Sequence, residues 1–184
     1  MLKKAPSYLV SSPKGILSGR DKGAELLDSL TDHLRSTEPD SVTPLDFSEV
    51  EFIDISCADE FLTKLLLRVG SGELGSRYIY TTGANSSVIE TLEAVLTLRN
   101  LAGIGKDGDL VRVLGVLKPP IREALDVILD KGQGTSSEFA EALGKNINIA
   151  CNRLNVLQRM GLVCRSREGS VRGGGRQFYY ESIV

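Results

Sequence analysis

LDFSEVEFIDISCADEF, residues 45–61, contains the end of an apolar strand, a short polar connection and the start of a helix. We expect the strand over residues 42–47 and the helix from Ser56 onward. One face of this helix is apolar, because large side chains recur at helical spacing at Phe61, Leu62, Leu65, Leu66 and Val69. A strand that leads into an amphipathic helix is typical of crossover connections between parallel strands. The stretch therefore predicts an α/β fold.

The alternation of strand and helix continues on both sides of this stretch. Upstream, a capping box at Ser18 is expected to open a helix. Downstream, a strand at residues 78–80 precedes a helix with a capping box at Ser87, and residues 109–117 are β-rich. Pro44 lacks a backbone N–H, so we expect it at the start of its strand or at an unpaired position. Residues 1–117 are thus predicted to form a mixed or parallel sheet with helices against it.

Residues 45–61 resemble the signature of STAS domains (sulphate transporter and anti-sigma factor antagonist), in which a strand ending in Asp-Leu/Phe-Ser leads through Phe-hydrophobic-Asp-x-Ser into a helix. They are closer to a STAS-like bacterial family with the motif hydrophobic-Asp-Phe-x-x-Val-x-Phe-Ile-x-x-Ser-x-Ala-Asp-Glu. The resemblance spans about residues 14–115. It implies that Ser56 matches a serine phosphorylated by a kinase that is also the anti-sigma factor. Cys57 departs from the usual glycine, and Ile55 from the usual serine or threonine.

Ser56 has two compatible interpretations. It is expected to be the N-cap of its helix, with Asp59 completing a capping box. It is also a candidate phospho-acceptor, because the dipole and free N–H groups of a helix N-terminus favour a phosphate. The carboxylates of Asp54, Asp59 and Glu60 would repel that phosphate, and we expect them to form a partner surface near the helix start.

Enzymatic activity is not expected. The carboxylates at residues 46–60 have no histidine beside them, and no nucleophile–base pair is visible. Residues 103–108 match G-x-G-x-x-G, but a helix precedes them and a strand follows, so we interpret them as a flexible turn and not a dinucleotide loop. One histidine and three scattered cysteines give no standard zinc site. We therefore predict no metal and no cofactor.

Charge is distributed unevenly along the chain. Residues 1–117 carry a net charge of −5 and residues 118–184 a net charge of +3. Within the second part, residues 145–176 hold seven basic residues against Glu168 alone. A basic patch on an otherwise acidic protein indicates a polyanionic partner. The odd number of cysteines predicts a reduced, cytoplasmic protein. The apolar runs are too short for a membrane span, and no signal peptide is expected.

Residues 118–184 are predicted to form a second domain. Pro119 and Pro120 open a helix that ends at Gly132, and a capping box at Thr135 opens a short helix that Gly144 stops. A third helix follows over residues 147–160, with Ile147, Ala150, Leu154 and Leu157 facing inward. Residues 162–167 then alternate as a strand, residues 169–175 form a glycine-rich tip, and residues 177–180 return. Two helices joined at a tight glycine turn and followed by a hairpin are typical of a winged helix-turn-helix.

The junction of the third helix and the hairpin, Leu-x-x-Leu-x-x-Met-Gly-Leu-Val at residues 154–163, resembles that of MarR-like and ArsR-like winged-helix regulators, over about residues 119–182. Asparagine and arginine read base edges in the major groove, and arginines near a wing tip reach phosphates or the minor groove. The predicted contacts to double-stranded DNA are Lys145, Asn148, Asn152, Arg153, Asn155, Arg159, Arg172 and Arg176.

Two functions stay open for the whole chain. The first is a DNA-binding transcriptional regulator whose STAS-like domain senses a signal, forms a homodimer or docks a partner. The second is a phospho-switched adaptor that binds a kinase or anti-sigma factor through its STAS-like domain, with Ser56 as the candidate position. In this reading the winged helix makes protein contacts. A hydrolase or transferase built on the carboxylates at residues 54–60 is the third and weakest hypothesis.

Overall fold

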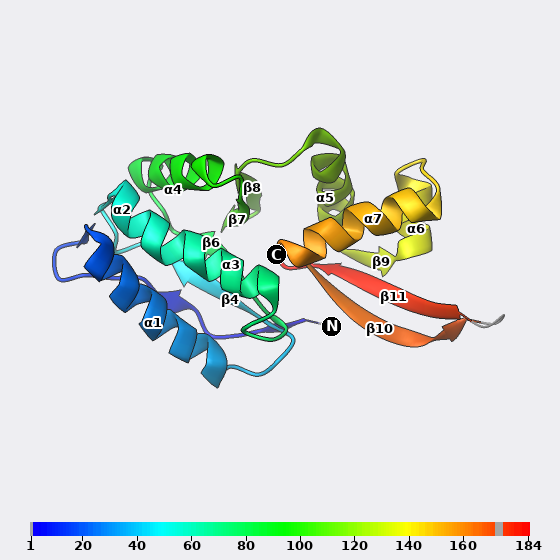
Figure 1. Cartoon of the computed structure of the whole chain (residues 1–184), viewed down its shortest axis with the longest axis horizontal. Coiled ribbons are helices and arrows are strands. Elements are labelled where there is room, and N and C mark those ends of the chain that lie inside the picture. The colour runs from blue at the N-terminus through cyan, green and yellow to red at the C-terminus, as the bar shows by residue number, and fades with distance from the viewer. Residues whose placement is uncertain (1, 172–174) are drawn as a thin grey trace.

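The computed structural model describes the backbone of residues 2–171 and 175–184, and their side chains apart from residues 167–171 and 175–177. Figure 1 shows two parts side by side, which we call the amino-terminal part (residues 2–117) and the carboxy-terminal part (residues 118–184). Together they give a mixed α/β chain. Within the described residues, no helix has the length and apolar character needed to cross a bilayer.

The amino-terminal part alternates strands and helices in the predicted manner. Its strands are β1 (Lys3–Lys4), β2 (Tyr8–Leu9), β3 (Ile16–Leu17), β4 (Ser41–Asp46), β5 (Phe52–Ile53), β6 (Arg77–Thr82), β7 (Ala102–Asp107) and β8 (Leu110–Gly115). Its helices are α1 (Arg20–Ser36), α2 (Ile55–Ala58), the π-helical turn η1 (Asp59–Thr63), α3 (Lys64–Ser71) and α4 (Ser86–Leu98). Helices α2, η1 and α3 follow one another without a break.

One mixed sheet organises this part. The strands lie in the order β1-β4-β6-β7-β8, and β2 pairs with β4 beyond the end of β1. The pairs from β1 to β7 are parallel, and β8 returns antiparallel to β7. Parallel neighbours need crossovers, which the α2–η1–α3 helix and α4 provide. The predicted mixed sheet with helices against it is confirmed.

Pro44 lies in the middle of β4, opposite Tyr80 of β6. On the other side of β4, the carbonyls of Val42 and Asp46 accept from Ala5 and Val10, and alternate residues of a strand point the same way. Pro44 therefore faces the interruption between β1 and β2, where its carbonyl accepts from the Ser7 hydroxyl. Its missing N–H falls at an unpaired position, as expected.

The two faces of the sheet belong to two different cores. Alternate residues such as Leu45 and Ile79 point into the first core, which α1, α2, η1, α3 and α4 complete. The intervening residues, Val42, Tyr78, Tyr80, Ala102 and Ile104, point to the opposite face. There they join a second core with buried side chains of the carboxy-terminal part, among them Phe139 and Leu154. The second core is therefore shared by both parts of the chain.

The carboxy-terminal part contains three helices and a small antiparallel sheet among its described residues. The elements are α5 (Pro119–Lys131), β9 (Gln133–Thr135), α6 (Ser136–Ala142), α7 (Ile147–Arg159), β10 (Val163–Val171) and β11 (Gly175–Ser182), with sheet order β10-β11-β9. Prolines open α5 and Gly132 ends it, and the capping box of Thr135 and Glu138 opens α6, as predicted. The hairpin β10–β11 extends away from the amino-terminal part (Figure 1).

Three local predictions for the amino-terminal part are wrong. Helix α1 has Gly19 as its N-cap instead of Ser18, whose hydroxyl donates to Asp54. Helix α4 starts at Ser86, because the Asn85 side chain caps it by accepting from the backbone N–H of Val88. Residues 103–107 belong to strand β7 and pair with β8, so the turn is made by Gly108 and Asp109 instead. At both helix starts, a side chain other than the expected serine accepts from the backbone N–H groups.

The two parts also meet through a close helix contact. The carboxyl end of α7 reaches the carboxyl end of α3, where Gly70 faces Arg159 and Gly161 faces Val69. A further bond runs from the backbone N–H of Leu2 to Glu181 at 2.9 Å. The position of α7 is therefore fixed by both parts of the protein.

Candidate functional site

Helix α7 has one buried face and one exposed polar face. Ala150, Leu154 and Leu157 are fully buried in the second core. Asn146 caps the helix by accepting from the backbone N–H of Ile149 at 2.9 Å. Helical spacing then turns Asn148, Asn152 and Arg159 away from the core, and all three side chains are exposed.

The exposed face continues to the turn before the helix. Lys145 is exposed there, and neither it nor Arg159 has a carboxylate partner among the described residues. Ile147 is 43% exposed, so the prediction that it faces inward is wrong. The core contacts of α7 begin only at Ala150, one turn later, and Ile147 and Ile149 flank the asparagines as exposed apolar side chains.

The structure does not place Arg153 with the outer asparagines. Its guanidinium donates to Glu123 of α5 at 2.5 Å, and its side chain is 15% exposed. Asn155 is also engaged: its Oδ1 accepts from Arg165 at 2.9 Å and from the Tyr180 hydroxyl at 3.1 Å. Both side chains therefore tie α7 to its neighbours, Arg153 to a helix and Asn155 to the small sheet.

A polar depression of about 450 Å³ lies beside this helix face. It is lined by Asn152, Asn155, Val156, Gln158, Arg159 and Arg165. Arg165 is exposed on β10, and its guanidinium stacks 4.6 Å from the centre of the Phe178 ring. Gln158 and Arg165 were absent from the predicted contacts. Arg165 could have been found from its position at the base of the hairpin, directly after the predicted helix.

The remaining predicted contacts lie in the hairpin. Arg172 lies outside the described residues. Arg176 is placed only by its backbone, which pairs with Ser170 across the hairpin. The described basic side chains that border the exposed face of α7 are therefore Lys145, Arg159 and Arg165.

Ser56 is not the N-cap of its helix, so the capping prediction is wrong. Asp54 takes that place: its carboxylate accepts from the backbone N–H of Cys57 at 2.7 Å. The same carboxylate accepts from the Ser18 hydroxyl at 2.5 Å and from the backbone N–H of Gly19 at 2.9 Å. Burial opposes ionisation of Asp54, but these hydrogen bonds outweigh it and lower its pKa. Ser56 is left exposed within the first turn of α2.

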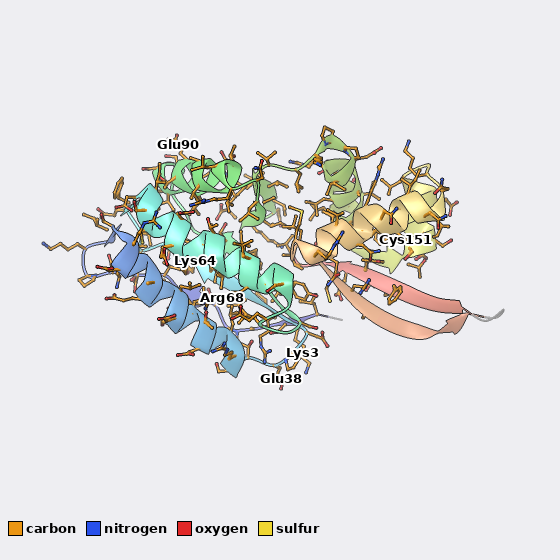
Figure 2. All side chains as sticks on the ribbon, in the orientation of Figure 1. Lys3, Glu38, Lys64, Arg68, Glu90 and Cys151 are labelled. Carbon is orange, nitrogen blue, oxygen red and sulfur yellow. The ribbon has the colours of Figure 1, made fainter. Side chains whose placement is uncertain are left out.

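Asp59 and Glu60 are held by internal ion pairs and do not form a free acidic surface. Asp59 accepts two bonds from Arg99, at 2.8 and 2.6 Å, which lower the pKa of its carboxyl group. Glu60 pairs with Lys64, labelled in Figure 2, and with Arg20 at 3.3 Å. The expected role of Asp59 in a capping box is also wrong, because it lies in the π-helical turn η1.

Exposed apolar side chains occur on α2 next to Ser56 and on strands β3 and β5. Ile55 is 55% exposed beside it, and Phe52 and Ile16 are paired neighbours on β5 and β3 that are both exposed. Exposed apolar groups of this size on adjoining elements indicate a surface suited to protein contact. Sequence reasoning missed them because it assigned this surface to the carboxylates.

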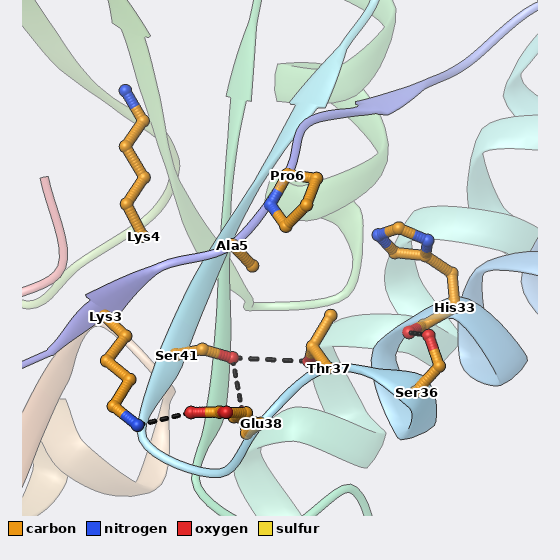
Figure 3. Close-up of a pocket in the computed structure, with 9 residues that line it drawn as sticks. All are labelled: Lys3, Lys4, Ala5, Pro6, His33, Ser36, Thr37, Glu38 and Ser41. Atoms are coloured by element: carbon orange, nitrogen blue, oxygen red, sulfur yellow. Dashed lines mark hydrogen bonds and ion pairs between the residues drawn. The ribbon is translucent and has the colours of Figure 1, made fainter.

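A separate hollow of about 360 Å³ lies between β1 and the end of α1 (Figure 3). Its most prominent charge, Lys3, is paired with Glu38, and the Ser41 hydroxyl donates to the Glu38 carbonyl at 2.7 Å. His33 lies across the hollow and packs edge-on against Tyr8. Lys4 is a second cation in the lining, and the Ser36 hydroxyl donates to the His33 carbonyl at 2.6 Å.

The exposed face of α7 and the adjoining base of the β10–β11 hairpin are thus the strongest candidate site. Its side chains are amides and guanidinium or ammonium groups, which bind anionic or hydrogen-bonding partners. Comparison with known proteins adds no assignment: the sequence matches no protein-family model and no curated protein.

Proposed function

We propose that the protein is a DNA-binding transcriptional regulator. The order helix, strand, helix, helix, strand, strand over α5 to β11 supports a winged helix-turn-helix, in which α7 would be the recognition helix and β10–β11 the wing. The observation that carries the proposal is the exposed polar face of α7, bordered by basic side chains without carboxylate partners among the described residues.

The chemistry of this face fits a duplex. Asn148 and Asn152 have amides that match the hydrogen-bonding edge of adenine in the major groove. Arg159 and Lys145 lie at opposite ends of the helix face, where phosphates of the two groove walls would lie. Arg165 at the base of the hairpin extends the basic surface toward the wing, and Arg172 and Arg176 add to it in this proposal.

The amino-terminal part would serve as a STAS-like module that senses a signal, forms a homodimer or docks a partner. Winged helices usually bind two-fold sites as dimers, and the described residues of the carboxy-terminal part contain no additional long helix for pairing. Contact between α3 and α7 supports this role, because a change in the amino-terminal part could move the recognition helix directly. In this proposal the protein acts in the cytoplasm, without a cofactor and without enzymatic activity.

The test is the salt dependence of binding to a random duplex, measured by fluorescence anisotropy. Binding that weakens steeply as salt rises is expected, because each phosphate contact releases counterions. Replacing Lys145 or Arg159 by alanine should weaken binding to every sequence and reduce the slope of log K against log salt by about 1 each. Replacing Asn152 should instead cost about 1–3 kcal/mol on a selected site and little on random DNA.

Lys14→Ala is the matched control. Lys14 is exposed between β2 and β3 in the amino-terminal part, so its removal changes the net charge equally without touching α7. The proposal requires that this variant keep the wild-type slope. Equal loss in Lys14→Ala and Arg159→Ala, or no binding at low salt, would show that α7 is not a DNA-reading helix.

A second function is favoured by the surface around Ser56. A phospho-switched adaptor needs an accessible acceptor next to a docking surface. Ser56 is exposed next to Ile55, and Phe52 and Ile16 are exposed on the paired strands β5 and β3. A phosphate there would lie at the positive end of the helix dipole, next to the Asp54 carboxylate that already accepts from the Cys57 backbone N–H. A chain that binds no duplex at low salt, but binds a kinase or anti-sigma factor less well after Ser56→Glu, would support this adaptor.

A further inference from the structure

A hollow of about 380 Å³ lies where the connection between the two parts of the chain meets α5 and α7. We call it the linker pocket. Its lining comes from the turn after α4, the connection itself, the first turn of α5 and the second half of α7: Asn100, Val116, Leu117, Lys118, Ile121, Val156 and Met160. The pocket is therefore built by both parts of the chain and by the segment that joins them.

Most of the lining is apolar and remains partly open to solvent. Val116 is 45% exposed, and Leu117, Ile121, Val156 and Met160 are half-buried around the same space. Small-molecule sites commonly have volumes of roughly 300–1,000 Å³, with a mostly apolar lining and a few polar groups that fix orientation. An apolar body that fills the hollow would remove these side chains from water.

The polar groups of the pocket select an anion. Lys118 is exposed at the N-cap of α5, and no carboxylate among the described residues pairs with it. Asn100 adds an amide at the same rim. No acidic side chain lines the pocket, so one negative group on an apolar ligand finds a cation and a hydrogen-bond donor without an opposing charge.

Val156 connects this pocket to the candidate site. Its side chain lines both the linker pocket and the polar depression that holds Asn152 and Arg159. Met160, one turn further on α7, also lines the linker pocket. A ligand in the pocket would therefore touch the helix that carries the exposed polar face, and any coupling between the two places would act in both directions.

We propose that the linker pocket binds a small molecule with an apolar body and a single carboxylate, and that its binding changes the affinity of α7 for a duplex. The second half of this statement rests on the proposed function. The first half concerns the pocket alone and is tested without DNA.

The chain offers a direct reporter, because its two methionines are Met1 and Met160. Protein labelled with ¹³C-methyl methionine gives one methyl signal from the pocket wall. Titration with 4-phenylbutyrate should shift the Met160 signal in a saturable manner, and the neutral 4-phenylbutyramide should bind more weakly. No shift with the carboxylate, or equal binding of acid and amide, overturns the proposed site or its selectivity.

Two variants locate the binding. Val116 lies in the connection and not on α7. Val116→Trp should fill the hollow and abolish the saturable shift of the Met160 signal. Lys118→Gln should weaken carboxylate binding about three- to fivefold, the range of a partly solvated ion pair, and leave amide binding unchanged. Leu98→Trp is the control, because Leu98 is 70% exposed on α4 and lines no part of the pocket. A Val116→Trp protein that titrates like the wild type would refute the site.

The link to DNA is measured by repeating the duplex titration at saturating 4-phenylbutyrate. A changed duplex affinity that Val116→Trp removes supports the link, and an unchanged affinity refutes it. A chain that binds no duplex at low salt refutes the link together with the proposed function. The Met160 titration still decides the pocket in that case, so the two failures are distinguishable.

Discussion

Gly70 of α3 lies so close to Arg159 of α7 that a Cβ at position 70 would sit 2.5 Å from the Arg159 carbonyl oxygen. At the neighbouring positions, a Cβ on Gly161 would lie 2.7 Å from the Val69 side chain. Helix α3 and the end of α7 with its following turn therefore approach each other through one glycine on each side, Gly70 and Gly161. This contact holds the end of α7 against the amino-terminal part.

Gly70→Ala should destabilise the protein by about 1–3 kcal/mol, because backbone at the contact cannot yield as a flexible side chain would. Helix propensity alone predicts the opposite sign, a gain of roughly 1 kcal/mol for alanine over glycine. Urea denaturation decides between them. Ser71→Ala, an exposed neighbour on the same helix, should cost no more than about 0.5 kcal/mol. A stabilised Gly70→Ala protein would mean that the helices do not touch in solution.

Asp54→Ala should cost about 1–2 kcal/mol of stability, because it removes the cap of α2 and the bonds to Ser18 and Gly19. Ser56→Ala should change stability by no more than about 0.5 kcal/mol, because Ser56 is exposed and caps nothing. Thermal or urea unfolding of the two variants gives the comparison. The reverse order of the two costs would restore Ser56 as the cap.

Asp59→Asn should lower stability by about 1–2 kcal/mol at neutral pH through loss of its bonds to Arg99. Because the pKa of Asp59 is lowered in the folded protein, this stabilisation is present above the unfolded-state pKa of about 4 and is lost as the pH falls through the folded-state pKa. The difference between wild type and variant should therefore shrink on acidification. Glu93→Gln removes an exposed carboxylate on α4 and should cost no more than about 0.5 kcal/mol at neutral pH.

The three cysteines should differ in reactivity toward a thiol reagent. Burial, together with the nearby Asp54 charge, raises the pKa of Cys57 to about 11, and burial also raises that of Cys164. Both thiols are therefore protonated at neutral pH and shielded. Cys151, labelled on α7 in Figure 2, is partly exposed and should react first. Mass spectrometry after brief alkylation gives the order, and early modification of Cys57 would contradict the packing of α2.

Much of the architecture could be predicted because it depends on local patterns. The alternation of strand and helix around residues 45–61, the proline-opened α5 and the Thr135–Glu138 capping box are all present as expected. Helix starts were less predictable. Ser18 and Ser87 carry the right spacing for a capping box, but Asp54 from another segment and Asn85 two residues upstream make the actual bonds.

The site was predicted only in part, because a helical pattern does not show what stands beside it. Asn148, Asn152 and Arg159 lie on the exposed face as spacing requires. Arg153 is turned aside by Glu123, a residue 30 positions earlier on α5. Likewise the alternation of Tyr78 and Tyr80 indicates an apolar sheet face, but it does not reveal that the carboxy-terminal part covers that face.

That covering has a consequence for how the chain can be divided. A fragment ending at residue 117 would expose Val42, Tyr78, Tyr80 and Ile104 to water. The complementary fragment would lose the side chains against which Phe139 and Leu154 pack. Each piece would be prone to aggregate by itself. The chain should melt in a single cooperative transition, and its halves could not be exchanged with those of other proteins as independent modules.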